Sequence, residues 1–272
     1  MPPFCRKRDH VHMRVVTLAS SSKGNCTLVS NGNRHLLIDA GISLKRIGAA
    51  LALLGVGILD IEGVLVTHEH SDHISGLNML SKYCGTPVYA SGGTADAVVR
   101  CAPNVRSLSV FEPGDVFELG GMEIGTFKTS HDAAESTGFT LRAGRAGMAY
   151  VTDLGCITKE VADAAGGLDL VLLEANYDPD MLINGRYPDF LKKRILGRRG
   201  HLSNIDCASA AVSMIGERTR RIVLAHLSIE NNFPDLAVET VRGVLKRAGV
   251  DVDSGVLVSA SPRFDMGMEY II

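Results

Sequence analysis

The sequence predicts an α/β (α+β) fold, in which two mixed β-sheets pack face to face and helices cover their outer sides. Groups of short strands and helices recur in both halves of the 272 residues, and no linker or low-complexity segment separates the halves. Hydrophobic residues make up 46% and charged residues 21% of the chain, which is typical of an ordinary globular protein. We therefore expect residues 13–272 to form a single domain, preceded by a flexible tail at residues 1–12.

The first half reads mainly as strands separated by turns. Residues 14–20, 26–30 and 35–40 are apolar segments interrupted by "SSKGN" and "NGN", which are rich in turn-forming residues. Residues 43–56 have helical spacing, with Ser43 as a plausible N-cap. An apolar, β-branched strand follows at 63–67, and residues 74–84 repeat apolar side chains at the three- and four-residue spacing of a helix.

The second half continues with strands and then alternates strands with helices. We expect strands at 86–90, 115–120, 122–130, 136–143 and 147–153, and a helix at 155–166. A buried strand at 168–175 contains Glu174, and a helix at 203–217 begins with Ser203 as its cap. A strand at 220–226 ends in His226, and a helix at 234–249 begins with Pro and ends with Gly.

Charge and cysteine content restrict the function classes. The net charge of −2 gives no general attraction to nucleic acid, so binding to a polyanion would need a local basic patch. The six cysteines are scattered without a C-x-x-C pair, which indicates reduced thiols rather than disulfides. No apolar run approaches the roughly 20 residues of a membrane span, and no secretory signal is evident. We expect a cytoplasmic protein without membrane contact.

The motif "THEHSDHISGL" carries the chemistry. His68 and His70 lie two residues apart in extended chain after an apolar strand, so their imidazoles point to the same side. Asp72 and His73 follow where the chain turns into a helix. Imidazole and carboxylate groups are the donors that bind zinc and similar divalent ions, so this spacing predicts a metal site at a strand end.

This motif resembles the signature of the metallo-β-lactamase fold, an αββα sandwich with a one- or two-metal site along one sheet edge. The later landmarks of that family follow in order: His131 in "KTSHDA", Asp153 in "VTDLG" and His226 in "LAHLS". The resemblance implies that His68, His70 and His131 bind one metal ion, that Asp72, His73 and His226 bind another, and that Asp153 bridges them. Asp39 in "LLIDAG" matches the buried aspartate that supports these ligands.

A basic run precedes a second histidine. "FLKKRILGRRGHLSN" places Lys192, Lys193, Arg194, Arg198 and Arg199 ahead of His201. "GHLSN" and "AHLSI" share three letters, and we assign the ligand role to His226 because it ends an apolar strand, as His68 nearly does. His201 instead stands at a helix N-terminus beside arginines, an arrangement that suits a phosphate. Its alternatives are a simple helix cap or a solvent-facing side chain, and the basic run taken alone is more often a solvated face.

Within the family, the segments "LASSSKGNCTLV", "RRGHLSN" and "LAHLSIENN" look like the pattern of the YycJ (WalJ/VicX) group. That resemblance implies a bacterial, cytoplasmic, metal-dependent nuclease, with members resembling 5′-to-3′ exonucleases on double-stranded DNA. We expect a hydroxide held by the two ions to attack phosphorus, with Asp72 essential for turnover. We expect His201, with Arg198 or Arg199, to bind the phosphate or the leaving oxygen.

Three questions stay open at this point. The same metal site would suit a hydrolase of small esters or thioesters, and an intact ligand set does not by itself exclude a non-catalytic regulatory protein. Five histidines and two aspartates suit zinc, although manganese or iron also accept mixed nitrogen and oxygen ligands. Aromatic content is 5% without tryptophan, so any contact with DNA is expected to involve mainly its backbone.

Overall fold

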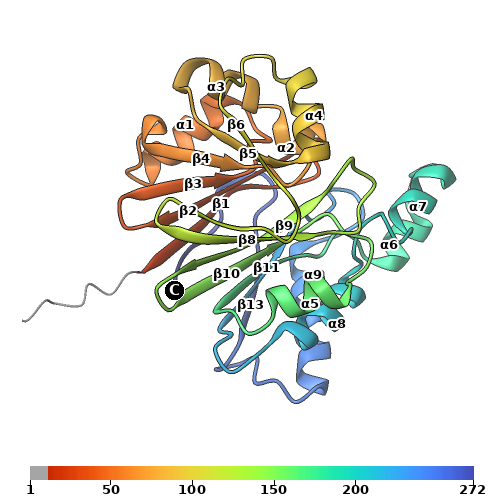
Figure 1. Cartoon of the computed structure of the whole chain (residues 1–272). Helices are drawn as coiled ribbons and strands as arrows, with labels where there is room; N and C mark the ends of the chain where they lie inside the picture. Colours follow the sequence, from red (N-terminus) through yellow and green to blue (C-terminus); the bar gives the residue numbers. More distant parts are fainter. Residues whose placement is uncertain (1–11) are drawn as a thin grey trace, which may run out of the picture.

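A computed structural model describes residues 12–272 and arranges them in four layers, with two β-sheets between two groups of helices (Figure 1). The predicted flexible tail at residues 1–12 therefore falls almost entirely outside the described residues. The first described strand begins at Met13, where the predicted domain begins. Among residues 12–272, no helix is long and apolar enough to cross a membrane.

The first sheet has seven strands, and most of them come from the N-terminal third of the chain. In spatial order they are β14 (Glu269–Ile271), β1 (Met13–Ser21), β2 (Gly24–Asn31), β3 (Arg34–Ile38), β4 (Ile61–Leu65), β5 (Val88–Ser91) and β6 (Leu108–Phe111). Strands β1 to β3 form an antiparallel meander, and β3 to β6 run parallel. The carboxyl ends of β3 and β4 consequently lie at the same edge.

The second sheet also has seven strands. Their order is β13 (Leu257–Ala260), β12 (Arg221–Ala225), β11 (Leu170–Glu174), β10 (Ala146–Val151), β9 (Thr137–Ala143), β8 (Met122–Lys128) and β7 (Val116–Leu119). Strands β10 to β13 run parallel, whereas β7 to β10 are antiparallel neighbours. Strands β8, β10, β11 and β12 therefore point the same way and end at one edge.

Helices cover the outer face of each sheet (Figure 1). The first sheet is covered by α1 (Leu44–Leu53), α2 (Ser71–Ile74), α3 (Leu77–Cys84) and α4 (Gly92–Cys101), with a 3-10 turn, η1, at Ile58–Asp60. The second is covered by α5 (Lys159–Ala165), α8 (Asn204–Met214) and α9 (Pro234–Arg247). Two short helices, α6 (Pro179–Asn184) and α7 (Asp189–Ile195), stand to the side of the sandwich.

Apolar side chains form three main layers of core. The layer between the sheets joins both halves of the chain, with Leu36 and Leu65 from the first sheet and Phe139, Leu172 and Val223 from the second. A second layer packs the first sheet against α1, α3 and α4, and a third packs the other sheet against α5, α8 and α9. The predicted αββα sandwich is confirmed. That residues 13–272 make one domain stays a prediction, which this shared central core supports.

The predicted elements differ from the structure mainly at short segments. The predicted helix at 74–84 is split into α2 and α3 at Gly76, where a Cβ atom would lie 1.9 Å from the carbonyl oxygen of Ile42. The chain bends there because the backbone of the Ile42 loop occupies the space a side chain would need. Helices α4, α6 and α7 and strands β6, β13 and β14 were not predicted; each is short, and short segments carry little periodic signal.

Candidate metal centre

Polar side chains follow the carboxyl ends of strands from both sheets and meet at one edge of the sandwich. Asp39 follows β3 and His68 follows β4 in the first sheet. In the second sheet, His131 follows β8, Asp153 follows β10 and His226 follows β12, while Glu174 is the last residue of β11. The parallel direction of these strands explains how residues distant in sequence come together.

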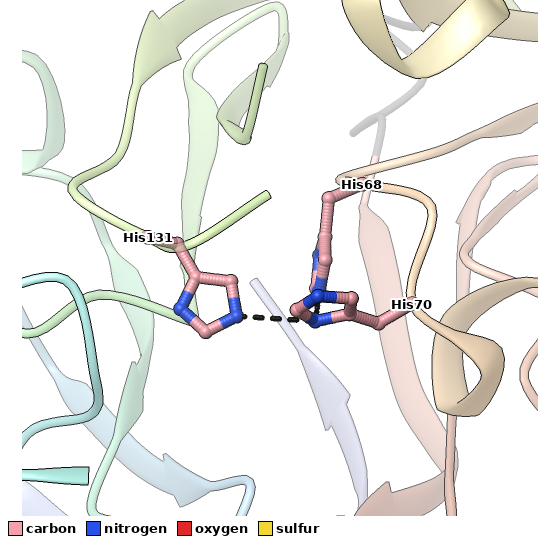
Figure 2. Close-up of side chains that lie close together, drawn as sticks. All are labelled: His68, His70 and His131. Atoms are coloured by element: carbon pink, nitrogen blue, oxygen red, sulfur yellow. Dashed lines mark hydrogen bonds between the residues drawn. The ribbon is translucent and has the colours of Figure 1, made fainter. Parts of the chain in front are cut away.

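The first cluster consists of His68, His70 and His131, whose imidazole rings converge (Figure 2). The Nδ1 atom of His70 lies 2.9 Å from Nε2 of His68 and 3.3 Å from Nε2 of His131. Zinc–nitrogen bonds of about 2.0–2.1 Å in tetrahedral geometry separate ligand nitrogens by roughly 3.3–3.4 Å. The three nitrogens are therefore close to the spacing that a metal ion requires.

Contacts on the far side of two of these rings fix their orientation. Nδ1 of His131 lies 3.0 Å from the carbonyl oxygen of Gly200, and Nδ1 of His68 lies 3.0 Å from the hydroxyl of Thr67. Burial, reinforced by the neighbouring histidines, holds the pKa of His68 well below its ordinary value. A neutral imidazole with a fixed ring is the form that binds a metal ion.

The second cluster consists of Asp72, His73 and His226. Oδ2 of Asp72 lies 3.4 Å from Nε2 of His73 and 3.3 Å from Nε2 of His226. On its other side, the His73 ring contacts Asp39, with 2.7 Å between Nδ1 and Oδ2. The other carboxylate oxygen of Asp39 accepts the backbone N–H of Thr67 at 2.8 Å. Asp39 is fully buried and contacts a predicted ligand from behind, the supporting position that the sequence predicted for it.

Asp153 lies between the two clusters. Its Oδ2 is 3.3 Å from Nε2 of His73, and its Oδ1 is 3.9 Å from Nε2 of His131. The Oδ2 atom is buried and has no hydrogen-bond partner among residues 12–272. A buried carboxylate oxygen without a donor is costly unless a cation satisfies it. This orphaned oxygen and the surrounding donor set fit a dinuclear centre for divalent cations.

The electrostatics of the centre favour positive charge. Burial alone lowers the pKa of His226, but Asp153, Asp72 and Glu174 outweigh burial and raise it to about 10. Burial raises the pKa of Asp72, yet His73 and His226 outweigh that effect and hold it far below the ordinary carboxyl value. These carboxyl groups are therefore ionised at neutral pH, and their negative charge attracts cations.

Backbone strain is concentrated at the same place. Asp39, Asp153 and His226 are the non-glycine residues with positive φ within the described part of the chain, at 61°, 58° and 54°. Such conformations cost on the order of 1 kcal/mol or more and cluster at functional sites. Each of the three immediately or nearly follows a strand, so the turn redirects its side chain into the centre.

His201 also lies at this centre. Its Nδ1 atom is 2.8 Å from Oε1 of Glu174 and 3.8 Å from Oδ1 of Asp153. Glu174 is fully buried, and the same Oε1 lies 2.8 Å from Nδ1 of His226. The other oxygen of Glu174 accepts the backbone N–H groups of Leu154 and Leu202, both at 3.2 Å. The structure thus joins His201 and His226 through one carboxylate.

The sequence analysis gave Glu174 no role, although it noted that a buried strand ends there. The available signal was an acidic residue at the end of an apolar strand, the same signal that marks Asp153. A second residue without a predicted role is Asn25, whose Nδ2 donates to Oδ2 of Asp72 at 3.2 Å. Asn25 belongs to β2, and its side chain reaches the centre from the first sheet.

The predicted arginines take different positions. The guanidinium of Arg199 donates to the carbonyl oxygens of His131 and Ala133, at 3.0 and 3.4 Å, and so supports the loop that carries a ligand. The backbone carbonyl of Arg198 accepts the hydroxyl of Ser130 at 2.7 Å. The basic side chain that lines the hollow at the metal centre is Arg194, which pairs with Asp132. A substrate contact by Arg198 or Arg199 stays a prediction.

The hollow has a volume of about 310 Å³ and opens over the second cluster. It is bounded by Ser22, His70, Ser71, Asp72, Asp153, Arg194, His201 and His226. Four of the seven predicted metal ligands, His70, Asp72, Asp153 and His226, are among these lining residues. A bound group would therefore meet the predicted cation positions on one side and Arg194 and His201 on the other.

Comparisons with known proteins agree with this geometry. A family model described as "Beta-lactamase superfamily domain" matches residues 34–227. The chain is 37% identical over 257 residues to an exodeoxyribonuclease, YycJ, of Bacillus anthracis, an alignment that covers 93% of this chain and 97% of the relative.

Solved structures give the same fold. The metallo-β-lactamase fold protein YhfI from Bacillus subtilis matches with a TM-score of 0.73 and 18% identity, covering 96% of this chain and 100% of that one. Zinc-bound PqqB from Methylobacterium extorquens matches with a TM-score of 0.69 and 20% identity, covering 95% and 99%. At these identities the two structures establish the architecture and nothing more specific.

Proposed function

This chain belongs to the metallo-β-lactamase superfamily, and from its similarity to an exodeoxyribonuclease we propose that it hydrolyses phosphodiester bonds at the ends of DNA. The family, the fold and the class of metal-dependent hydrolase that the sequence predicted are confirmed. The observation that carries the DNA proposal is the cluster of seven histidine and aspartate side chains in a chain similar over nearly its whole length to such an enzyme.

The proposal extends to the arrangement of the cations. His68, His70 and His131 would hold one divalent ion, and Asp72, His73 and His226 the other, with Asp153 in contact with both. The two ions, when bound, would polarise the scissile phosphate and supply a nucleophile from water at neutral pH. Zinc suits a set of five histidines and two aspartates, and manganese or iron are the alternatives.

The chain's own residues would orient the ligands and manage protons. Asp39 fixes the ring of His73, and Gly200 fixes that of His131 through its carbonyl oxygen. Glu174 accepts a hydrogen bond from Nδ1 of His201, which leaves the Nε2 atom to face a phosphate oxygen or the leaving oxygen. We assign His201 the role of holding, and protonating, that leaving oxygen.

Arg194 would supply positive charge to the phosphate. It lines the hollow at the centre, and about half of its side chain is exposed. Asp132 pairs with its guanidinium and so holds the group near His131, the residue next to Asp132 in sequence. A bidentate guanidinium is well suited to a phosphodiester oxygen pair.

Three finer points belong to the same proposal. Degradation from 5′ to 3′ on double-stranded DNA follows from the sequence resemblance to the YycJ group. A cytoplasmic location is supported by the five cysteines of residues 12–272, all of which are free thiols, as a reducing compartment requires. Hydrolysis of a small ester or thioester is the alternative, and the charged side chains around His201 favour a phosphate over a neutral ester.

The testing experiment is cleavage of end-labelled, 5′-phosphorylated double-stranded DNA by purified protein with added Mn²⁺ or Zn²⁺. Progressive release of mononucleotides is expected from the wild type. Asp72→Asn should abolish it, whereas Asp163→Asn, on an exposed face of α5, should leave it unchanged. Protein that binds two ions yet cleaves no DNA, while hydrolysing small esters, would refute the nuclease proposal.

A further inference from the structure

A second hollow adjoins the one at the metal centre. The two share Ser22, Arg194 and His201 as walls, so a ligand can extend from one into the other. The second hollow has a volume of about 150 Å³. This is about half the lower limit of roughly 300 Å³ for ordinary ligand pockets, so it has room for a single ring system and not for a chain of nucleotides.

One wall of the second hollow is apolar and belongs to the α6–α7 segment. Tyr187, Leu191 and Ile195 line it. The same three side chains pack with Leu182 and Tyr177 in a small core separate from the main layers. The wall is therefore held in place by its own cluster, and Figure 1 shows α6 and α7 beside the sandwich rather than within it.

Another part of the lining is polar and comes from the loops after β11 and β12. Asn176 and Ser228 line it. Asn176 is 5% exposed, and its Nδ2 atom donates to the carbonyl oxygen of His226 at 2.8 Å. The amide of Asn176 and the hydroxyl of Ser228 are groups that can form hydrogen bonds with the polar edge of a ligand.

Charge is concentrated at the junction of the two hollows. Arg194 bounds both, and Asp132 holds its guanidinium beside the first metal cluster. His201 also lines both hollows. A ligand that spans the junction would present a phosphate to these two side chains and place its next ring in the second hollow.

We propose that the second hollow binds the base of the terminal nucleotide, the one that cleavage releases. This inference rests on the proposed function. A nucleobase has apolar faces and an edge of N–H and carbonyl groups, which matches a hollow lined by apolar side chains together with the amide of Asn176 and the hydroxyl of Ser228. Because the space accommodates a single base, the hollow limits the product to one nucleotide per cleavage.

The test compares two DNA duplexes that differ only in the terminal nucleotide, which carries either a normal base or an abasic tetrahydrofuran sugar. Wild-type protein should cleave the normal end about tenfold faster than the abasic end, because the abasic end lacks the contact between the base and the apolar wall that contains Tyr187. Leu191→Trp fills the hollow and should lower cleavage of the normal end to about the rate of the abasic end, so that the preference for a base is lost. Equal rates for both ends in the wild type would overturn the inference.

Leu196→Trp is the matched control, because Leu196 directly follows α7, is 48% exposed and does not line either hollow. It should keep the wild-type preference for a normal end. Tyr187→Ala is the second variant, since it removes part of the wall without adding bulk and tests the same preference if Leu191→Trp fails to fold. Retention of the preference in both folded wall variants would also overturn the inference.

A binding measurement separates this inference from the nuclease proposal. Calorimetry with metal-loaded protein should show a deoxynucleoside 5′-monophosphate binding about tenfold more tightly than deoxyribose 5-phosphate, and Leu191→Trp should remove the difference. If DNA is not cleaved but this difference is found, the nuclease proposal fails and the base-binding hollow stands. If DNA is cleaved and no difference is found in binding or in rate, the hollow fails alone.

Discussion

Glu174→Gln is the most informative single change at the centre. The carboxylate receives four donors: Nδ1 of His201 and of His226 at its Oε1 atom, and the backbone N–H groups of Leu154 and Leu202 at its Oε2 atom. Burial raises the pKa of Glu174, but His201 and His226 outweigh burial and hold it well below the ordinary value. The group is thus an ionised acceptor for two imidazoles.

The magnitude follows from the number of donors. A glutamine side chain has one acceptor oxygen, so its NH₂ group must face either the two imidazoles or the two backbone N–H groups. A hydrogen bond to a charged group contributes about 1.5–3 kcal/mol, and each 1.4 kcal/mol is about a tenfold change in rate. We therefore expect the kcat of DNA cleavage to fall about 10- to 100-fold, with the secondary structure retained.

The assay is a double-mutant cycle with His201→Gln, measured at saturating metal concentration. If Glu174 acts by positioning His201, the double variant should be little slower than His201→Gln alone, because the two residues work as one unit. The metal content of each variant, and the pH profile of kcat, separate this role from loss of a cation through His226. Wild-type kcat in Glu174→Gln, or strictly additive effects in the cycle, would refute the reasoning.

Two further predictions concern the second cluster and the helix break beside it. Asp39→Asn is compatible with the positive φ at this position, but it replaces the carboxylate that contacts His73. We therefore expect the affinity for one of the two cations, measured by equilibrium dialysis, to fall about 10- to 100-fold. Unchanged affinity would contradict the supporting role of Asp39. Gly76→Ala would place a Cβ atom 1.9 Å from the carbonyl oxygen of Ile42, so the free energy of unfolding should fall by about 3 kcal/mol or more. Its control, Gly243→Ala within α9, should instead raise that free energy by about 0.5–1 kcal/mol, and equal effects in urea unfolding would refute the steric argument.

The cluster of predicted metal ligands could be located from the sequence because its members combine a residue type with a position. His68, Asp153 and His226 each follow an apolar strand, and a strand end is where a buried sheet exposes side chains to a ligand. The H-x-H-x-D-H spacing adds a second, independent signal. The structure brings all seven side chains within reach of one another, and their roles as ligands stay a prediction that metal analysis can decide.

Glu174 and the arginines show what sequence alone could not decide. Glu174 also ends an apolar strand, but a single carboxylate without a motif is indistinguishable from a turn residue. In the basic run, five cations follow one another closely, and only the three-dimensional path separates them. Helix α7 ends at Ile195, and the turn after it directs Arg199 back to the carbonyl oxygen of His131, which leaves Arg194 at the hollow.

The second hollow depends on contacts that no local pattern encodes. Its apolar wall comes from α6 and α7, and its polar wall comes from loops that follow β11 and β12. Tyr187 and Leu191 are only partly buried. Helices α6 and α7 are short, and α7 is rich in charged residues, so the sequence around Tyr187 and Leu191 shows little apolar periodicity. Tyr187 lies a few residues before the basic run, but closeness in sequence does not indicate which cavity a side chain lines.

The division of the ligands between the two sheets explains why the centre can tolerate its own strain. His68, His70, Asp72 and His73 come from the first sheet, and the remaining three ligands come from the second. Three positive-φ residues and several buried carboxylates make this edge costly, at about 1–3 kcal/mol for each strained residue. The apolar layer between the sheets includes residues of the strands that precede these side chains, so packing of the two sheets holds both halves of the centre together. If the centre binds two cations as proposed, the packed core of the sandwich therefore contributes to positioning their predicted ligands.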